Sequence, residues 1–514
     1  MSREPNQANA LQRIVIVGGG SAGWMTAAAL SSMLGGLGTS IELVESDAIG
    51  TVGVGEATIP DMLNFNRMLG IDEAEFMAAT DATFKLGIEF VNWGKVGERY
   101  FHPFGKHGVD MQGIDFHQYW LAAQNRGHAE PIERYSMSAH AAYAGKFVHP
   151  NADPKSPRSH IRYAYHFDAT RYAAYLRRYA EANGVVRTEG RVSNVGLNAE
   201  SGAVERLTLD DGRAVEGDFF FDCTGFRALL MRGALGTKFR DWSEWLPCDS
   251  AQTVACEHNG PVPPYTRATA RDAGWQWRIP TQKRTGNGHL YCSDFISDQD
   301  AQDVLVQSLD GAPLGEPRKI AFKTGCLETF WEKNVVGIGL SSGFLEPLES
   351  TSLYLIQTGI SKFISLFPTA DTPRAVVDEY NRQMRTEFEQ VRDFIILHYK
   401  TTQRDDTPFW RRCRDMDIPN SLSRKIELFR EAGRIFRDDD ELFTRPSWVA
   451  VMVGQNMLPE RVDPMVAQLP PAQIEHSLAS MRAGMMRAAD ALPVHAAYLA
   501  QFTQHAKRSN THAA

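Results

Sequence analysis

The sequence predicts an α/β fold in which a parallel sheet comes first and helices come last. Three observations support this class: a strand, glycine turn, helix and strand succeed one another over residues 13–46, antiparallel strands are indicated at 203–226, and charged helical sequence fills 374–400. Parallel strands joined by a helix are typical of α/β folds. We therefore expect a parallel sheet at the start of the chain.

The first unit is a run of short segments. "RIVIV" at 13–17 is a β-branched stretch bounded by glycine, which favours a buried strand. "WMTAAALSSML" at 24–34 favours a helix, "GGLGTS" at 35–40 a turn, and "IELVES" at 41–46 a second strand. Together they predict one βαβ unit.

Later segments extend the sheet region and then leave it. A helix is predicted over 167–184, where it ends in a glycine C-cap. The Asp211–Gly212 step indicates a hairpin within 203–226. From about residue 375 the chain becomes helical and more charged, so we predict two parts, residues 1–375 and a mainly helical 376–514.

Composition excludes several classes of protein. The net charge of -8 argues against a nucleic-acid binder, which would need a basic face. No run of about 18 apolar residues predicts a membrane span, and the polar start at 1–13 lacks a signal core. The 6 cysteines have no zinc-like spacing, so we expect no metal site. Reduced, buried thiols and a cytoplasmic location are the expectation.

A dinucleotide site is predicted at the first strand–helix junction. Gly18, Gly20 and Gly23 form G-x-G-x-x-G, and Glu45 ends the next strand. The glycines permit the turn, the approach of a pyrophosphate and helix packing, while the helix N-terminus supplies amide donors. Glu45 can accept the ribose hydroxyls. The alternative is a glycine-rich turn beside an exposed glutamate, and this unit alone does not separate FAD from NAD(P).

The sequence contains no good second Rossmann unit that would hold another dinucleotide. The later pattern "GIGLSSG" at 337–343 is one residue too long for the fingerprint. The chain therefore has one predicted dinucleotide site and no evident place for a nicotinamide reductant.

A family resemblance runs over nearly the whole chain. Its segments are "VGGGSAGW", "GVGEATIP" at 53–60, "FKLGIEFVNW" at 84–93, "YFHPFG", "YHFDATRYAAYLR", "DCTGFRALL", "GWQWRIP" at 274–280, "GFLEPLESTSLYL" at 343–355 and "RDFIILHYK" at 392–400. In these segments the chain resembles the flavin-dependent tryptophan halogenases. W-x-W-x-I-P is the most specific of them.

The resemblance implies a fold and a reaction. The fold is an FAD-binding, flavin-monooxygenase-like module with inserted substrate-site segments, here 1–375, and a mainly helical substrate-covering region, here 376–514. Reduced FAD, O2 and chloride or bromide give hypohalous acid, which passes through an internal tunnel to an electron-rich ring. A separate flavin reductase supplies the reduced FAD, in agreement with the missing nicotinamide site. A homodimer is an open option.

The resemblance also implies residue roles at the cofactor and the oxidant. The cofactor-binding residues are Gly18, Gly20, Ser21, Ala22, Gly23, Glu45, Ala57 and Gly339. Lys85 would deliver the electrophilic halogen, and Glu349 would polarise the oxidant or accept the ring proton. The alternative for Lys85 is a lysine on the protein surface. The alternative for Glu349 is a loop carboxylate that caps a helix N-terminus, with Glu346 as the catalytic carboxylate.

Thr351 and Ser352 match the halide-binding positions of the family, which use backbone N–H groups. Ser352 stands where the family usually has glycine, so the geometry of the halide site and the preference for chloride or bromide stay open. The alternative is that hydroxyl groups at 350–352 only cap the following helix.

His102 and Phe104 match residues that pack against the substrate ring, since a flat π-rich ring prefers aromatic walls. Phe443 is followed by Thr444, where tryptophan-specific relatives have a Phe-Trp pair, and Trp448 is a substitute that does not align firmly. The substrate is therefore predicted as a small indole-type compound: tryptophan, free indole or a larger indole. Ordinary core packing is the alternative for these rings.

Trp275 and Trp277 give the resemblance its sharpest implication. They would lie beside the flavin and fill the place that the substrate takes in simple flavin hydroxylases, so that only a small halide reaches the oxidant. Two core indoles that support a sheet are the alternative.

Two other functions compete with halogenation. One is an FAD-dependent aromatic monooxygenase that hydroxylates its substrate directly, and the other is a flavin-binding protein without catalysis. The presence of both Lys85 and Glu349 argues against the second.

Overall fold

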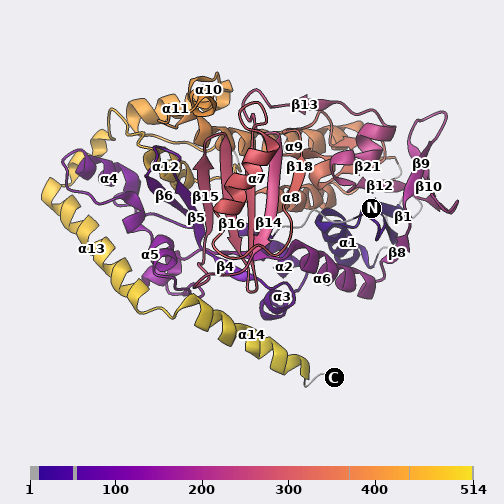
Figure 1. Ribbon diagram of the computed structural model, residues 1–514, viewed down its shortest axis with the longest axis horizontal. Coiled ribbons are helices and arrows are strands. Elements are labelled where there is room, and N and C mark those ends of the chain that lie inside the picture. Colours follow the sequence, from indigo (N-terminus) through magenta and orange to yellow (C-terminus); the bar gives the residue numbers. More distant parts are fainter. Residues whose placement is uncertain (1–10, 37, 50–54, 370, 439, 512–514) are drawn as a thin grey trace, which may run out of the picture.

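The computed structural model describes residues 11–36, 38–49, 55–369, 371–438 and 440–511. The polar start at 1–10 and the first two residues of the segment at 53–60 lie outside these ranges. Within them, strands and helices form a mixed α/β structure, as the sequence predicts (Figure 1).

The predicted βαβ unit opens a parallel sheet. β1 (Arg13–Val17) leads into α1 (Ser21–Leu34) and then β2 (Ser40–Glu45). Ile14 lies opposite both Ile41 and Phe219, in parallel register. The sheet has the order β20-β21-β12-β1-β2-β8. Its other strands are β8 (Val186–Glu189), β12 (Phe219–Asp222), β20 (Trp331–Glu332) and β21 (Val335–Gly337).

A second, mostly antiparallel sheet stands beside the first and has the order β18-β14-β17-β16-β15-β5-β6. Its strands are β5 (Gly87–Val91), β6 (Arg99–Pro103), β14 (Ser250–Cys256), β15 (Thr266–Arg271), β16 (Gly274–Pro280), β17 (Thr285–Tyr291) and β18 (Arg318–Ala321). β16 is the whole "GWQWRIP" segment, paired on both sides by β15 and β17. Because alternate side chains point to opposite faces, Trp275 and Trp277 share one face.

A small sheet connects these two regions. It has the order β3-β7-β4, with β3 (Glu56–Ala57), β7 (Ala164–Phe167) and β4 (Thr83–Lys85). β7 therefore joins Ala57, a predicted cofactor residue, to the strand that ends at Lys85. The remaining strands form two ribbons: β9 (Val192–Leu197), β10 (Val204–Leu209) and β11 (Ala214–Glu216), and β13 (Phe239–Asp241), β19 (Gly325–Leu327) and β22 (Gly343–Phe344).

Helices cover both regions. Besides α1, those before β22 are α2 (Asp61–Met68), α3 (Glu73–Ala79), α4 (Phe116–Gln124), α5 (Met137–Tyr143), α6 (Ala169–Ala182) and α7 (Asp298–Gln307). Those after it are α8 (Ser352–Ser365), α9 (Arg374–Lys400), α10 (Pro408–Asp415), α11 (Asn420–Ala432), α12 (Arg445–Gly454), α13 (Pro471–Asp490) and α14 (His495–Thr511). The predicted boundary at 375/376 falls in the first turn of α9.

The C-terminal helices lie on the outside of the molecule. Figure 1 shows α13 and α14, in yellow, running along one side, with α10 and α11 above the second sheet. None of the described helices combines the length and the apolar character that a bilayer crossing requires. All the cysteines are buried and unpaired.

Candidate active site

A cavity of about 560 Å³ lies where the parallel sheet meets the second sheet. Most of the predicted cofactor residues line it: Gly18, Gly20, Ser21, Ala22, Glu45, Ala57 and Gly339. Gly23 is buried behind them, and a Cβ at this position would stand 1.8 Å from the Gly18 carbonyl oxygen. Gly23 therefore serves the packing of α1 on β1.

The turn at the mouth of α1 fits a dinucleotide pyrophosphate. Gly18 has a φ of 110°, a conformation that favours glycine. No side chain caps the first turn of α1, and a Cβ built on Gly20 meets nothing within 4 Å among the described residues. Free amides at a helix N-terminus, with open space above them, suit an anion.

Arg187 orients the carboxylate of Glu45. Its Oε1 accepts a hydrogen bond of 2.6 Å from Arg187 Nε, while the residue also lines the cavity. This ion pair fixes one carboxylate oxygen and leaves the other for a ligand hydroxyl.

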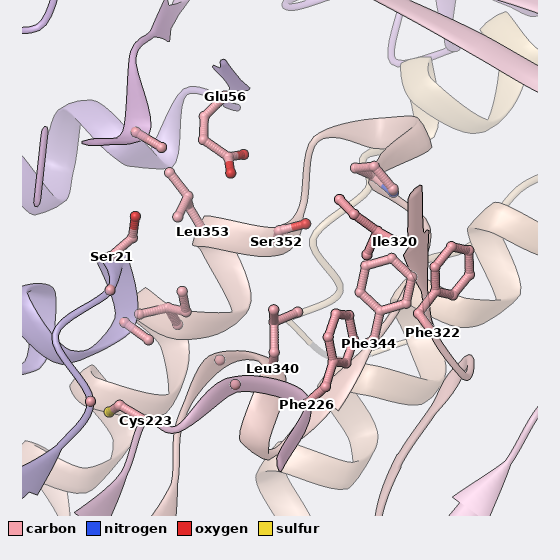
Figure 2. Close-up of a pocket in the computed structure, with 18 of the residues that line it drawn as sticks. Ser21, Glu56, Cys223, Phe226, Ile320, Phe322, Leu340, Phe344, Ser352 and Leu353 are labelled. Atoms are coloured by element: carbon pink, nitrogen blue, oxygen red, sulfur yellow. The ribbon is translucent and has the colours of Figure 1, made fainter. Parts of the chain in front are cut away.

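The cavity has polar and aromatic sides that the sequence did not reveal. Figure 2 shows Ser21, Glu56 and Ser352 around the polar side and Phe226, Phe322 and Phe344 grouped on the other. The Phe322 and Phe344 ring centroids are 4.6 Å apart. Burial raises the pKa of Glu56 to about 7.

Trp275 and Trp277 line the same cavity. Their ring centroids are 5.8 Å apart, and both residues are buried. The Nε1 of Trp277 has no hydrogen-bond partner among the described residues, whereas Trp275 donates to Glu346 at 3.0 Å. The indoles thus form a wall between the cavity and the interior of the second sheet.

The N-terminus of α8 opens near this wall. Ser352 lines the cavity and Thr351 is buried beside it. No side chain caps α8, and the Thr351 hydroxyl has no partner within the described part of the chain. The backbone N–H groups of the first turn, not hydroxyl caps, are therefore what this helix presents.

Lys85 is completely buried. Its Nζ donates to the Thr58 carbonyl oxygen at 2.9 Å and to Ser350 Oγ at 2.7 Å. Ser350 itself lines the dinucleotide cavity, so a single hydroxyl group joins the amine to the cavity wall. Burial lowers the pKa of Lys85 to about 7, with the charge of Glu349 opposing the shift. Amine and ammonium forms are both accessible near neutral pH.

Glu349 is buried between two histidines. Its carboxylate oxygens lie 3.0 and 3.1 Å from His102 Nδ1, and Oε1 lies 2.8 Å from His398 Nε2. Burial by itself would raise the pKa of Glu349, but the histidines outweigh it and lower the pKa to about 2. Because an ionised carboxylate only accepts hydrogen bonds, His102 Nδ1 carries the proton.

The predicted substrate residues occupy different places around this pair. Phe104 places its ring 5.1 Å from Lys85 Nζ. His102 contacts Glu349, as described above, so its ring is held by the carboxylate. Phe443 stacks on Phe394 at 3.7 Å, and Phe394 lies edge-on to His398 at 5.5 Å. The structure thus brings Phe104 to Lys85 and His102 to Glu349. Phe443 lies further from this pair and contacts Phe394.

Comparisons with known proteins decide the family. The tryptophan halogenase family model matches residues 13–471. The chain belongs to the tryptophan halogenase family. It is 33% identical to tryptophan 6-halogenase SttH of Streptomyces toxytricini, over 96% of this chain and 98% of that protein. Two solved flavin-dependent halogenases are similar at 47% identity and a TM-score of 0.93: Xcc4156 of Xanthomonas campestris and BrvH of Brevundimonas sp. BAL3.

These structures match over 96% of the chain and 98 to 99% of their own lengths. The protein is therefore a flavin-dependent halogenase, and its cofactor is FAD, which the glycine turn, Glu45 and the cavity fit. Direct hydroxylation is not favoured.

In this halogenase, sequence reasoning missed three residues that complete the site. Ser350 stands between the predicted Glu349 and Thr351, and His398 lies in the family segment at 392–400. Glu56 lies in the segment at 53–60. Each was inside a quoted segment, but no local pattern assigns it a contact.

Proposed function

We propose that this halogenase attaches chlorine or bromine to the ring of an indole-type substrate, with Lys85 as the residue that hands over the halogen. The observation that carries the proposal is the buried Lys85 amine, hydrogen-bonded to Ser350 on the cavity wall. A buried lysine is costly, so its presence beside a cofactor cavity points to chemistry.

The α8 N-terminus is the proposed halide site. Its uncapped first turn offers amide donors and the positive end of the helix dipole, and Ser352 faces the cavity. Reduced FAD, when bound, would supply the electrons that activate O2 for oxidation of the halide to hypohalous acid. Thr351 and Ser352 would hold the halide, while Trp275 and Trp277 keep an aromatic ring out of the same space.

Lys85 and Glu349 then divide the work at the ring. The ammonium form of Lys85 can donate to hypohalous acid, and its amine form can accept the halogen. Glu349 stays ionised because His102 and His398 hold it, so it can stabilise positive charge on the ring and take its proton. Either form of Lys85 leads to the same transfer of one halogen atom to one carbon.

The substrate follows from the walls and the relatives. SttH is named a tryptophan 6-halogenase, and RebH of Lentzea aerocolonigenes, 34% identical, a tryptophan 7-halogenase. Phe104 and the Phe394–Phe443 stack offer aromatic surfaces near Lys85. Trp448 packs on Phe394 at 5.0 Å, and its Nε1 has no partner among the described residues. Tryptophan, free indole and larger indoles are all candidates.

We also propose the working context. A separate flavin reductase supplies reduced FAD. The cytoplasm is the proposed compartment, supported by buried cysteines that form no disulfide. The division into 1–375 and 376–514 has functional support, because the cavity lining comes from the first part apart from Phe388, and His398, Phe443 and Trp448 come from the second. Light scattering would decide whether a homodimer forms.

The test is a mass-spectrometric assay of products. The protein is incubated with FAD, a flavin reductase, NADH, bromide and a panel of indoles. We expect monobrominated product, and a fall of about 100-fold or more in Lys85→Met, since a positioned proton-transfer group contributes at least this much. Reoxidation of reduced flavin should continue in the variant.

Lys333→Met is the control, because Lys333 donates to the Ser201 carbonyl oxygen at the exposed turn between β20 and β21, away from the site. Bromination that survives in Lys85→Met would contradict the proposal. A product that gains oxygen whether or not bromide is present would indicate direct hydroxylation instead.

A further inference from the structure

The carboxyl groups of Glu346 and Glu349 are close in sequence but lie in different environments. Glu346 precedes the 3-10 turn Pro347–Glu349 and Glu349 is its last residue, and both are buried. Glu349 is held by histidines, as described. Glu346 Oε2 instead accepts hydrogen bonds from Trp275 Nε1 at 3.0 Å and from the Tyr399 hydroxyl at 2.6 Å. Its Oε1 has no partner among the described residues.

Glu346 does not face the cofactor. The cavity lining includes its neighbours Leu345 and Pro347 but not Glu346 itself. Trp275 does line the cavity, so the indole stands between the carboxyl group and the flavin site. Glu346 can therefore act on the reaction only through the ring that it holds.

The orientation of the Trp275 indole depends on this hydrogen bond. The indole has one donor, and rotation about two side-chain bonds would turn a different edge toward the cavity. Trp275 otherwise contacts other rings, Trp277 at 5.8 Å and Trp93 at 6.4 Å, which fix its position less specifically than a hydrogen bond. The bond to Glu346 sets which face of the ring closes the cavity.

We propose that Glu346, supported by Tyr399, is a positioning residue that holds the Trp275 indole as a shield over the flavin site. With the indole locked, the oxidant meets the halide and not water or an aromatic ring. This inference rests on the proposed halogenation and adds the residues that keep it coupled.

One helix end serves both carboxyl groups. His398 and Tyr399 are consecutive residues in the last turn of α9, and they contact Glu349 and Glu346 respectively. Neighbouring residues on a helix point about 100° apart, so one rigid turn reaches both sides of the 346–349 turn. The catalytic carboxylate and the shield are thereby set by the same element.

Burial raises the pKa of Glu346 to about 7, against the hydrogen bonds from Tyr399 and Trp275, whereas the pKa of Glu349 is lowered to about 2. A group without a cation beside it suits a hydrogen-bond acceptor with a structural task. This contrast also supports Glu349 over Glu346 as the catalytic carboxylate.

The first test measures coupling, defined as brominated product formed per reduced flavin consumed. Glu346→Leu removes the acceptor and should lower coupling by about fivefold or more, the value of one buried hydrogen bond. Glu346→Gln keeps an acceptor oxygen and should restore most of the coupling. In a Trp275→Phe background, which has no indole donor, Glu346→Leu should cause little further loss.

The second test does not depend on halogenation. In the FAD-free chain labelled with 15N-tryptophan, the Trp275 indole N–H signal is assigned by its absence in Trp275→Phe. Glu346→Leu should shift that signal and speed its exchange with solvent. The signals of Trp120 and Trp331, which donate to the carbonyl oxygens of Glu130 and Lys333, should stay in place.

An unshifted Trp275 signal together with unchanged coupling in Glu346→Leu would overturn the inference, and so would equal losses in Gln and Leu variants. If Glu346→Leu does not fold, Tyr399→Phe removes the other donor to Glu346 and replaces it in both tests, and Trp275→Phe replaces it in the coupling test. If the wild-type protein brominates nothing, the proposed function fails, while the indole signal still decides whether Glu346 holds Trp275.

Discussion

At the scale of single residues, burial of the Lys85 amine lowers the stability of the folded protein. It is fully buried and its hydrogen-bond partners, the Thr58 carbonyl oxygen and the Ser350 hydroxyl, carry no charge. The unfolded chain keeps the ordinary pKa of 10.5, whereas burial lowers the folded value to about 7. The folded protein must therefore either bury a charge or release a proton.

Lys85→Met should therefore stabilise the protein most at low pH. Below pH 7 both states hold the proton and the full penalty applies, while between pH 7 and 10.5 the unfolded state binds more protons, so wild-type stability rises with pH. We expect a gain of about 1–4 kcal/mol at pH 6 that narrows toward pH 10. Thermal unfolding of both proteins across this range is the measurement. A gain that grows with pH would contradict it.

At the scale of an element, two glycines near the β1–α1 turn have different roles. A Cβ on Gly23 would overlap the Gly18 carbonyl oxygen at 1.8 Å, whereas a Cβ on Gly20 meets nothing within 4 Å of the described structure. One glycine is required by the packing of the helix on the strand. The other leaves space that the chain itself does not use.

Alanine at these positions should have different effects. Gly23→Ala should destabilise the FAD-free chain by about 1–3 kcal/mol, as overpacking does. Gly20→Ala, with an ordinary φ of −75°, should leave that stability unchanged and weaken FAD binding by about tenfold through contact with the pyrophosphate. Melting curves without FAD and flavin titrations provide the readouts. Equal melting temperatures for Gly23→Ala and wild type would refute the packing role.

At the scale of the whole molecule, the C-terminal helix supports the strand that carries Lys85. His495, the first residue of α14, accepts a hydrogen bond from the Phe84 backbone N–H at 3.3 Å. Phe84 stacks on Phe147 at 3.9 Å, and Tyr498 and Phe502 of α14 pack on its ring at 6.0 and 5.8 Å. A helix more than 400 residues away in sequence, with |i−j| of 411, thus supports the strand that carries Lys85.

Removal of residues 495–514 should therefore lower the melting temperature and reduce halogenation more than FAD binding. The described cavity lining contains no residue after Phe388, so the cofactor site loses no contact. Removal of residues 512–514 alone is the control. Parallel loss of FAD binding and halogenation in the longer truncation would show that α14 supports the whole fold and not β4 in particular.

The sequence predicted the parts of the fold that depend on neighbours in the chain. The βαβ unit, its glycine turn and Glu45 all lie within residues 13–46, where backbone conformation and hydrophobic period are decided locally. The halogenase family was also predicted from the quoted segments and is confirmed by the comparisons. The role of each site residue remains a prediction.

By itself, then, the sequence determined the α/β class, the glycine turn of the βαβ unit and the family. Only the tertiary structure decided that Lys85 meets Ser350, 265 positions away, and that His102 and His398 hold Glu349 while Trp275 and Tyr399 hold Glu346. The physical reason is range: a turn or a helix is set by the residues beside it, whereas the pKa of a buried amine or carboxyl group is set by whatever distant segments pack around it.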